Sequence, residues 1–149
     1  MDRGTFLTGE FHHTLDDRGR VAIPARFRAR LERGATLARW LDGCLALFPQ
    51  DEWEGLAARI AALPLTNARA REFARFMSSG ASDVELDRQG RVLVPAYLRT
   101  YAGVTEGEVV VVGALNRLEV WAPETWATYR SRIEDQPEAL AEHLAELGI

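Results

Sequence analysis

Two short segments of the sequence share a pattern that could bind an anion or the edge of a base. An aspartate is followed four residues later by an arginine, once in Asp16–Arg20 and again in Asp87–Arg91. Gly19 and Gly90 precede the arginines, and glycine accepts the positive φ with which a hairpin reverses through a bulge. Because a guanidinium is a planar fork of donors, it suits phosphates and guanine edges. The pattern therefore predicts two tight loops that each present an arginine.

The aspartates have a structural use as well. Their carboxylates can accept hydrogen bonds from loop N–H groups and can hold the arginine across the turn. For Asp16 and Asp87 this pinning of the hairpin is the favoured interpretation. The arginines can do both jobs, since a guanidinium has five donors and one carboxylate uses only a few of them.

A two-stranded β-ribbon fits the DNA major groove, where an arginine at its tip can reach guanine O6 and N7 or a phosphate. Further arginines near the loops are expected to contact phosphates and to set position rather than to read sequence. The residues expected to bind DNA are Arg18, Arg20, Arg26, Arg28, Arg88 and Arg91. Those expected to shape the loops are Asp16, Gly19, Asp87 and Gly90.

Charge is distributed unevenly along the chain. The net charge is −4, yet residues 1–40 hold eight arginines against five acidic residues, and the remainder holds ten against 17. All 18 basic residues are arginine, which a bias in genome composition explains, but their clustering is less easily explained that way. A basic N-terminal segment on an acidic body is compatible with a nucleic-acid partner.

The sequence gives little support to an enzyme. Asp16 and Asp17 are adjacent, so on a strand they point to opposite faces and make a poor acid–base pair. His12 and His13 lack ligands at metal spacing, and we expect one to point inward and one outward. No phosphate-binding glycine loop or nucleophile motif is present. We therefore expect no catalytic residue, metal, cofactor or small-molecule substrate.

The composition is that of a folded domain. Apolar residues make up 47 % of the 149 residues, enough for a core, and their runs are too short to cross a membrane. The first residues do not resemble a signal peptide, and Cys44 is the single cysteine, which we expect to be buried. These features predict a soluble cytoplasmic protein.

Internal repetition is the strongest signal in the chain. Leu15–Ala25 and Leu86–Ala96 agree at Leu, Asp, Gly, Arg, Val, Pro and Ala with a constant offset of 71 residues. A second block, Leu45–Trp53, matches Leu118–Trp126 at an offset of 73. Since a module of this size buries too little surface to be stable alone, we expect the two copies to interleave their strands in one shared barrel.

Both copies have the same expected plan, in which two strands flank the loop, a short helix follows a proline, and a hairpin leads to a closing helix. We expect strands at 11–15, 20–23, 36–41 and 44–48 in the first copy and at 83–86, 91–94, 108–113 and 117–121 in the second. The closing helices are expected at 50–62 and 123–134. Gly34 and Gly103 are expected to cap the short helices, Asp51 to cap the helix at 50–62, and Pro123 to lie in the first turn of the last one.

Between the copies, a helix to about Ser78 carries an apolar stripe that we expect to pack on the core. The expected organisation is a first module at 6–62, a linker helix at 63–77, a second module at 78–133 and a helical tail at 134–149. The fold class is mostly β with short helices, a double swapped-hairpin barrel formed by two internal repeats.

These segments resemble the MraZ family. The resemblance rests on Gly9–Ala25, Leu41–Pro49 and the second Asp-x-x-x-Arg loop, and also on Phe73–Phe76, Ser79–Ala81 and Asn116–Trp121. It covers roughly residues 6–130, and the tail after 135 is not diagnostic.

The resemblance implies two AbrB-like swapped-hairpin halves in one chain and a homo-oligomeric ring. It implies a nucleoid-associated transcriptional regulator of the bacterial division and cell-wall gene cluster, which binds short tandem repeats in its own promoter. The essential loop arginine of the family falls on Arg20, with Arg18 at the basic position before the glycine. The alternative is an AbrB-like antitoxin that binds a partner protein, but such proteins usually carry one copy and a disordered tail.

Overall fold

The computed structural model describes residues 6–105 and 107–148. In these residues eight strands form a single antiparallel sheet that curls into a nearly closed barrel. The strands are β1 (Leu7–Leu15), β2 (Arg20–Ala22), β3 (Ala35–Arg39), β4 (Leu45–Pro49), β5 (Ser82–Val84), β6 (Arg91–Leu93), β7 (Gly107–Leu115) and β8 (Leu118–Trp121). The helices are α1 (Gln50–Ala61), α2 (Ala68–Gly80), α3 (Ala96–Ala102), α4 (Pro123–Glu134) and α5 (Pro137–Ala145), with 3₁₀ segments η1 (Ala25–Leu31) and η2 (Leu41–Gly43).

The two copies of the repeat interleave throughout the sheet. The strand order is β5-β3-β4-β8-β7-β1-β2-β6, so pairs of strands from one copy alternate with strands from the other. The longest ladder joins the copies, because β1 pairs with β7 from Leu7 opposite Leu115 to Leu15 opposite Gly107. The predicted fold class, mostly β with short helices in a barrel made by two internal repeats, is confirmed.

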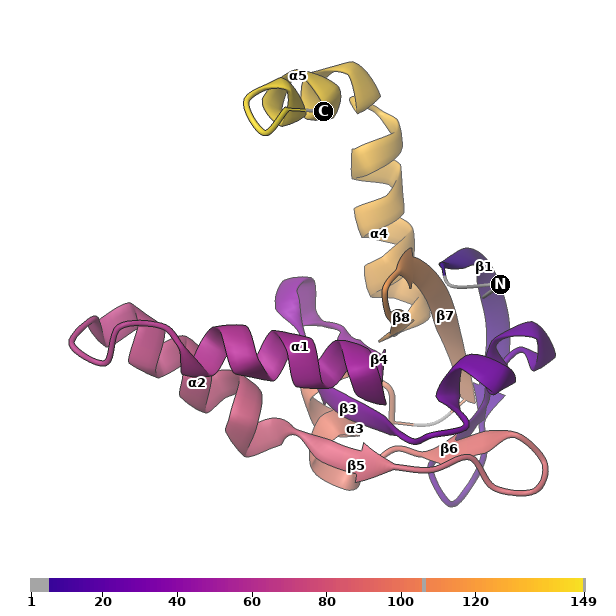
Figure 1. Cartoon of the computed structure of the whole chain (residues 1–149). Helices are drawn as coiled ribbons and strands as arrows, with labels where there is room; N and C mark the ends of the chain where they lie inside the picture. Colours follow the sequence, from indigo (N-terminus) through magenta and orange to yellow (C-terminus); the bar gives the residue numbers. More distant parts are fainter. Residues whose placement is uncertain (1–5, 106, 149) are drawn as a thin grey trace.

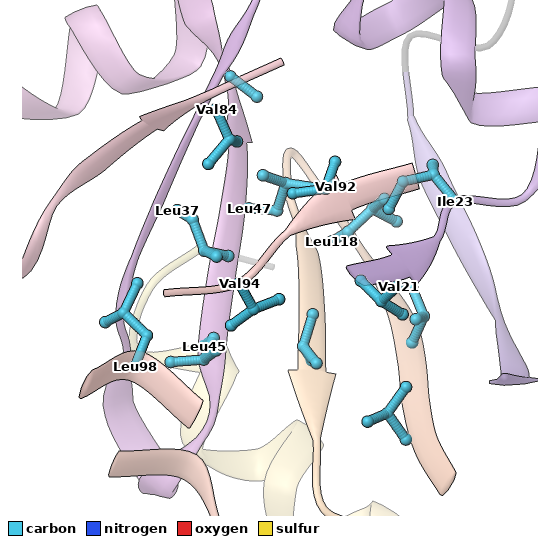
Figure 2. Packing of buried hydrophobic residues seen from close by; sticks show 14 of the residues in the cluster. Val21, Ile23, Leu37, Leu45, Leu47, Val84, Val92, Val94, Leu98 and Leu118 are labelled. Carbon is cyan, nitrogen blue, oxygen red and sulfur yellow. The ribbon is translucent and has the colours of Figure 1, made fainter. Parts of the chain in front are cut away.

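The core lies inside the barrel and draws on both copies equally. Val21 and Ile23 from the first copy meet Val92 and Val94 from the second, all at most 1 % exposed. Figure 2 shows these side chains converging on Leu37, Leu45, Leu47, Val84, Leu98 and Leu118. Neither copy could bury these residues alone, since each lines only part of the interior.

The helices extend from the sheet in two groups. Figure 1 shows α1 and α2 side by side on one flank, and α4 leading to α5 at another. The apolar stripe of α2 packs as expected, because Phe73, Phe76 and Met77 join a cluster with Phe48. Cys44 is 1 % exposed, which confirms its expected burial. Every helix in the described ranges is too short or too polar to cross a bilayer.

Two of the expected helix caps are wrong. Gly103 does cap α3 in the left-handed conformation, but Gly34 lies beyond the end of η1, whose C-cap is Glu32 in right-handed geometry. Asp51 makes no cap because α1 already begins at Gln50, after Pro49. Its carboxylate instead accepts a hydrogen bond from Nη1 of Arg30 at 2.7 Å. Most other expected ends lie within three residues, but β1 begins at Leu7 rather than at 11 and α2 at Ala68 rather than at 63. Helix α4 has the predicted bounds, with Pro123 in its first turn.

Alanine should have opposite effects on stability at two glycines, Gly113 in the ladder between β1 and β7 and Gly55 in α1. A Cβ on Gly113 would lie 2.4 Å from the backbone nitrogen of Thr8, whereas Gly55 in α1 has nothing within 4 Å. We expect Gly113→Ala to lower the free energy of unfolding by about 2 kcal/mol or more, because both partners are backbone and cannot yield easily. Gly55→Ala should raise it by about 0.5–1 kcal/mol through helix propensity. Urea unfolding of both variants measures this, and equal effects at the two sites would contradict the strand pairing.

Candidate nucleic-acid interface

The two Asp-x-x-x-Arg loops have the same backbone geometry. In the first, the N–H of Asp16 donates to the carbonyl of Arg20 at 2.9 Å, and the N–H of Gly19 donates to that of Asp16 at 3.0 Å. The Asp87–Arg91 loop repeats both bonds at 2.9 and 3.0 Å. Gly19 has φ 84° and Gly90 has φ 75°, a region that side chains of other residues rarely adopt. The repeat in sequence is thus a repeat in loop conformation.

Each aspartate organises its own loop. Oδ1 of Asp16 accepts from the N–H groups of Arg18 at 2.9 Å and Arg20 at 2.8 Å. Oδ1 of Asp87 accepts from those of Gln89 and Arg91, both at 2.9 Å. These backbone hydrogen bonds hold the pKa of both carboxyl groups below the usual aspartate value. The largest contribution comes from the N–H of Arg20 at Asp16 and from the N–H of Arg91 at Asp87. Both aspartates are therefore ionised at neutral pH.

The loops are joined across the boundary between the two copies. β2 pairs with β6, with Val21 opposite Val92 at the centre. The carbonyl of Gly19 accepts from the N–H of Val94 at 2.8 Å, and the carbonyl of Gly90 accepts from the N–H of Ile23 at 2.9 Å. In Figure 1 both loops emerge on the side of the sheet away from α4 and α5. We call this pair, residues 16–20 and 87–91, the paired loops.

Four charged side chains tie the paired loops together. Nε of Arg20 lies 2.8 Å from Oδ2 of Asp16, and Nε of Arg91 lies 3.0 Å from Oδ2 of Asp87. The copies are also cross-linked, because Nη1 of Arg91 lies 3.4 Å from Oδ2 of Asp16. The reciprocal pair, Nη1 of Arg20 and Oδ2 of Asp87, is 3.9 Å apart. Each arginine side chain remains 27 % exposed, so the network is open to a ligand from solvent.

Two further arginines support the loops from behind. Nε of Arg28 donates to the carbonyl of Ile23 at 2.9 Å, and Nε of Arg99 donates to that of Val94 at 3.0 Å. A Cβ on Gly90 would lie 2.2 Å from Nε of Arg28, and one on Gly19 would lie 2.9 Å from the guanidinium of Arg99. Each glycine is therefore needed twice, for its φ and for the arginine of the opposite copy.

The remaining candidates divide between two places. Arg18 and Arg88 are exposed on the paired loops, beside Arg20 and Arg91. The side chain of Arg26 instead donates to Oγ1 of Thr8 at 3.0 Å and lies over the ring of Phe27. Thr8 is about 23 Å along β1 from its loop end at Leu15, at the usual rise per residue. The structure thus gathers Arg18, Arg20, Arg28, Arg88 and Arg91 near the paired loops and places Arg26 elsewhere.

Sequence reasoning missed how Arg28 and Arg99 act. Arg28 was expected to contact DNA, and Arg99 was not among the residues expected to bind it. The offset of 71 residues makes Arg28 and Arg99 equivalent, which predicts that they play the same role but not which residue each one contacts. Only the crossed pairing of β2 with β6 shows which glycine each one faces.

The described residues contain no cluster of three or more side chains suited to hold a metal ion. His12 is exposed on β1, with Nε2 2.9 Å from Oε2 of Glu10, and His13 is half-buried, as the expected alternation requires. Glu10 also pairs with Nη1 of Arg130 at 2.9 Å. These groups form a surface ion cluster on β1 and α4, separate from the paired loops.

Comparison with known proteins identifies the repeat. A family model described as "MraZ protein, putative antitoxin-like" matches residues 6–76 and again residues 77–146. The chain is 48 % identical to Transcriptional regulator MraZ of Herpetosiphon aurantiacus and 47 % identical to that of Moorella thermoacetica, each over 141 residues. It is 42 % identical to that of Syntrophomonas wolfei, also over 141 residues. These alignments cover 95 % of the chain and 98 % of each relative. The chain belongs to the MraZ family.

Proposed function

We propose that the chain is a transcriptional regulator that binds double-stranded DNA sequence-specifically through the paired loops. The observation that carries the proposal is the crossed pairing of β2 with β6, which places both Asp-x-x-x-Arg loops side by side and joins them by backbone hydrogen bonds. The names of the relatives support the regulatory role, since each is called a transcriptional regulator. That name is not the name of an enzyme, in agreement with the expectation that the chain has no catalytic role.

The chemistry of the paired loops suits DNA. Arg18, Arg20, Arg88 and Arg91 are carried by the loops, against Asp16, Asp17 and Asp87. Arg28 and Arg99 behind the loops raise the positive charge further. Asp16 and Asp87 are engaged by loop N–H groups and by the guanidinium groups of Arg20 and Arg91, and the loops together carry one more arginine than aspartate. Exposed arginines can bind phosphates, and those at the turn can reach guanine in the major groove.

The finer parts of the proposal concern the target and the assembly. The resemblance implies tandem repeats in the promoter of the chain's own gene, within the division and cell-wall cluster, and a ring of identical subunits. One pair of loops offers few contacts, so several pairs on one ring would gain avidity on repeated DNA. The site of action would then be the cytoplasm, on the nucleoid.

The antitoxin alternative has one observation in its favour, the words "antitoxin-like" in the description of the family model. Against it, residues 123–134 and 137–145 form α4 and α5, whereas toxin-binding tails of such proteins usually lack structure. Purification of the untagged chain with a small, stoichiometric protein partner would favour this alternative over direct promoter control.

The first test compares Arg20→Ala with Arg69→Ala on DNA from upstream of the gene. Arg69 is an exposed arginine on α2, so the control removes the same side chain away from the loops. We expect Arg20→Ala to weaken binding about 5- to 150-fold, since a bidentate arginine–guanine contact contributes about 1–3 kcal/mol. Arg20→Lys should keep part of the affinity but lose part of the specificity, because an ammonium on a flexible stem lacks the planar fork of donors that matches guanine O6 and N7. Fluorescence anisotropy against a scrambled duplex measures both, and equal binding by Arg20→Ala and Arg69→Ala would remove the loops from the interface.

Salt provides the second test. If about four loop arginines neutralise phosphates, raising the salt concentration from 50 to 200 mM should weaken binding roughly 100-fold per pair of loops. Arg18→Ala and Arg88→Ala should each make this dependence shallower, by about one unit in the slope of log affinity against log salt. Titrations at four salt concentrations give the slope. A slope that neither variant changes would show that these arginines do not face the phosphates.

The third test uses pH and concerns the carboxylates that hold the loops. Because the folded pKa of Asp16 and Asp87 is lowered, their contribution to stability is present above the ordinary aspartate pKa and is lost as pH falls through the lower, folded value. We expect the amide NMR signals of Arg20 and Arg91 to stay constant from pH 8 to 5 and to titrate only below about pH 3.8. Asp16→Asn removes the titration at Arg20 and leaves that at Arg91. A midpoint at or above the ordinary aspartate pKa would contradict the hydrogen bonds described.

A further inference from the structure

The paired loops have the same backbone but different side chains at two equivalent positions. Asp17 of the first loop corresponds to Arg88 of the second, and Arg18 corresponds to Gln89. The N–H groups of Arg18 and Gln89 both donate to the aspartate of their own loop at 2.9 Å, so the two side chains start from matching positions. Any difference between the loops in what they bind must arise from these side chains and from what they contact.

In the second loop the arginine is held on every nitrogen. Nε of Arg91 donates to Asp87 at 3.0 Å, and Nη1 donates to Asp16 at 3.4 Å. Nη2 donates to Oε1 of Gln89, the residue two positions earlier. A bidentate contact with guanine needs two neighbouring N–H groups of the guanidinium. Three of the five N–H groups of Arg91 are therefore used within the protein, so a guanine has to compete with these acceptors for the guanidinium.

In the first loop the arginine is held on one side only. Nε of Arg20 donates to Asp16 at 2.8 Å, but Nη1 lies 3.9 Å from Asp87, beyond hydrogen-bonding distance. No described residue hydrogen-bonds to Nη2 of Arg20. The residue equivalent to Gln89 is Arg18, which has no acceptor and repels a second guanidinium. The outer edge of Arg20 is thus available, and Arg18 adds a second exposed cation beside it.

We propose that the paired loops read DNA with a fixed polarity, in which the first loop specifies a base and the second holds the backbone. Gln89 is the positioning residue that sets this difference, because its side-chain oxygen accepts a hydrogen bond from Nη2 of Arg91, the nitrogen that has no described partner in Arg20. The inference rests on the proposed DNA binding and adds to it that the site read by one pair of loops is not a palindrome. Although the fold of the two copies is nearly symmetric, the binding chemistry of their loops is not.

The test is selection of binding sites from a randomised duplex library with the full chain. Gln89→Met keeps the length of the side chain but removes the acceptor, so Arg91 is released, whereas Gln89→Glu keeps an acceptor at that place. We expect the wild type and Gln89→Glu to select guanine in one half of the site only. Gln89→Met should add a guanine preference in the other half, with affinity for duplexes that carry it raised about fivefold or more.

Single arginine variants give an independent measurement on the same duplexes. Arg20→Ala should abolish the base preference of the first half, and Arg91→Ala should lower affinity by the same factor for all sequences. A palindromic site selected by the wild type, or identical selections by Gln89→Met and Gln89→Glu, would overturn the inference while leaving DNA binding in place. Absence of specific binding by the wild type at 50 mM salt would overturn the proposed function, and this inference with it. Thermal unfolding of each variant checks that the fold is kept.

Discussion

The structure depends on the antiparallel pairing of two three-residue strands, β2 and β6, around Val21 and Val92. Because the two strands come from different copies, their short ladder brings the two loops close together. The carbonyl of each loop glycine accepts from the backbone of the opposite copy. The same pairing turns Val21 and Val92 into the barrel, where both are buried. One contact therefore closes the core and sets the loops, so the surface proposed for binding cannot move independently of the interior.

Interleaving also explains why the two copies occur in one chain. A unit of about 60 residues buries a smaller fraction of its surface than a larger domain does, and it is marginally stable alone. Here the copies are joined by several strand ladders, and the longest one, between β1 and β7, runs for nine residue pairs. Covalent linkage makes this association intramolecular, so it does not depend on protein concentration. It also frees each copy to diverge, because the two halves need only fit one another and not a second identical copy.

Much of the fold and of the paired loops could be predicted from the sequence, because the two copies show the same local residue patterns. The offset of 71 residues predicted the matching loops, and the pattern of proline, apolar and polar residues predicted α4 with its observed bounds. Gly34 was misjudged because the right-handed end of η1 is a local hydrogen-bonding outcome that composition does not encode. The support of Gly19 by Arg99 was beyond prediction for another reason: it joins residues 80 positions apart through a strand pairing that the sequence does not specify. The division into modules at 62, 77 and 133 stays a prediction.

The difference between Arg18 and Gln89 shows how a symmetric scaffold can carry an asymmetric function. The backbone requirements at the loops are strict, since each glycine meets both a positive φ and a guanidinium of the opposite copy. The positions between aspartate and glycine carry no such backbone requirement, because their side chains are exposed and the loop conformation uses only the N–H groups of Arg18 and Gln89. Change is therefore tolerated where it alters what a ligand meets and resisted where it would alter the loop. A duplicated module that varies only at such positions keeps one fold while its two loops bind differently. The hydrogen bond from Arg91 to Gln89, which the first loop lacks, is the contact that distinguishes them.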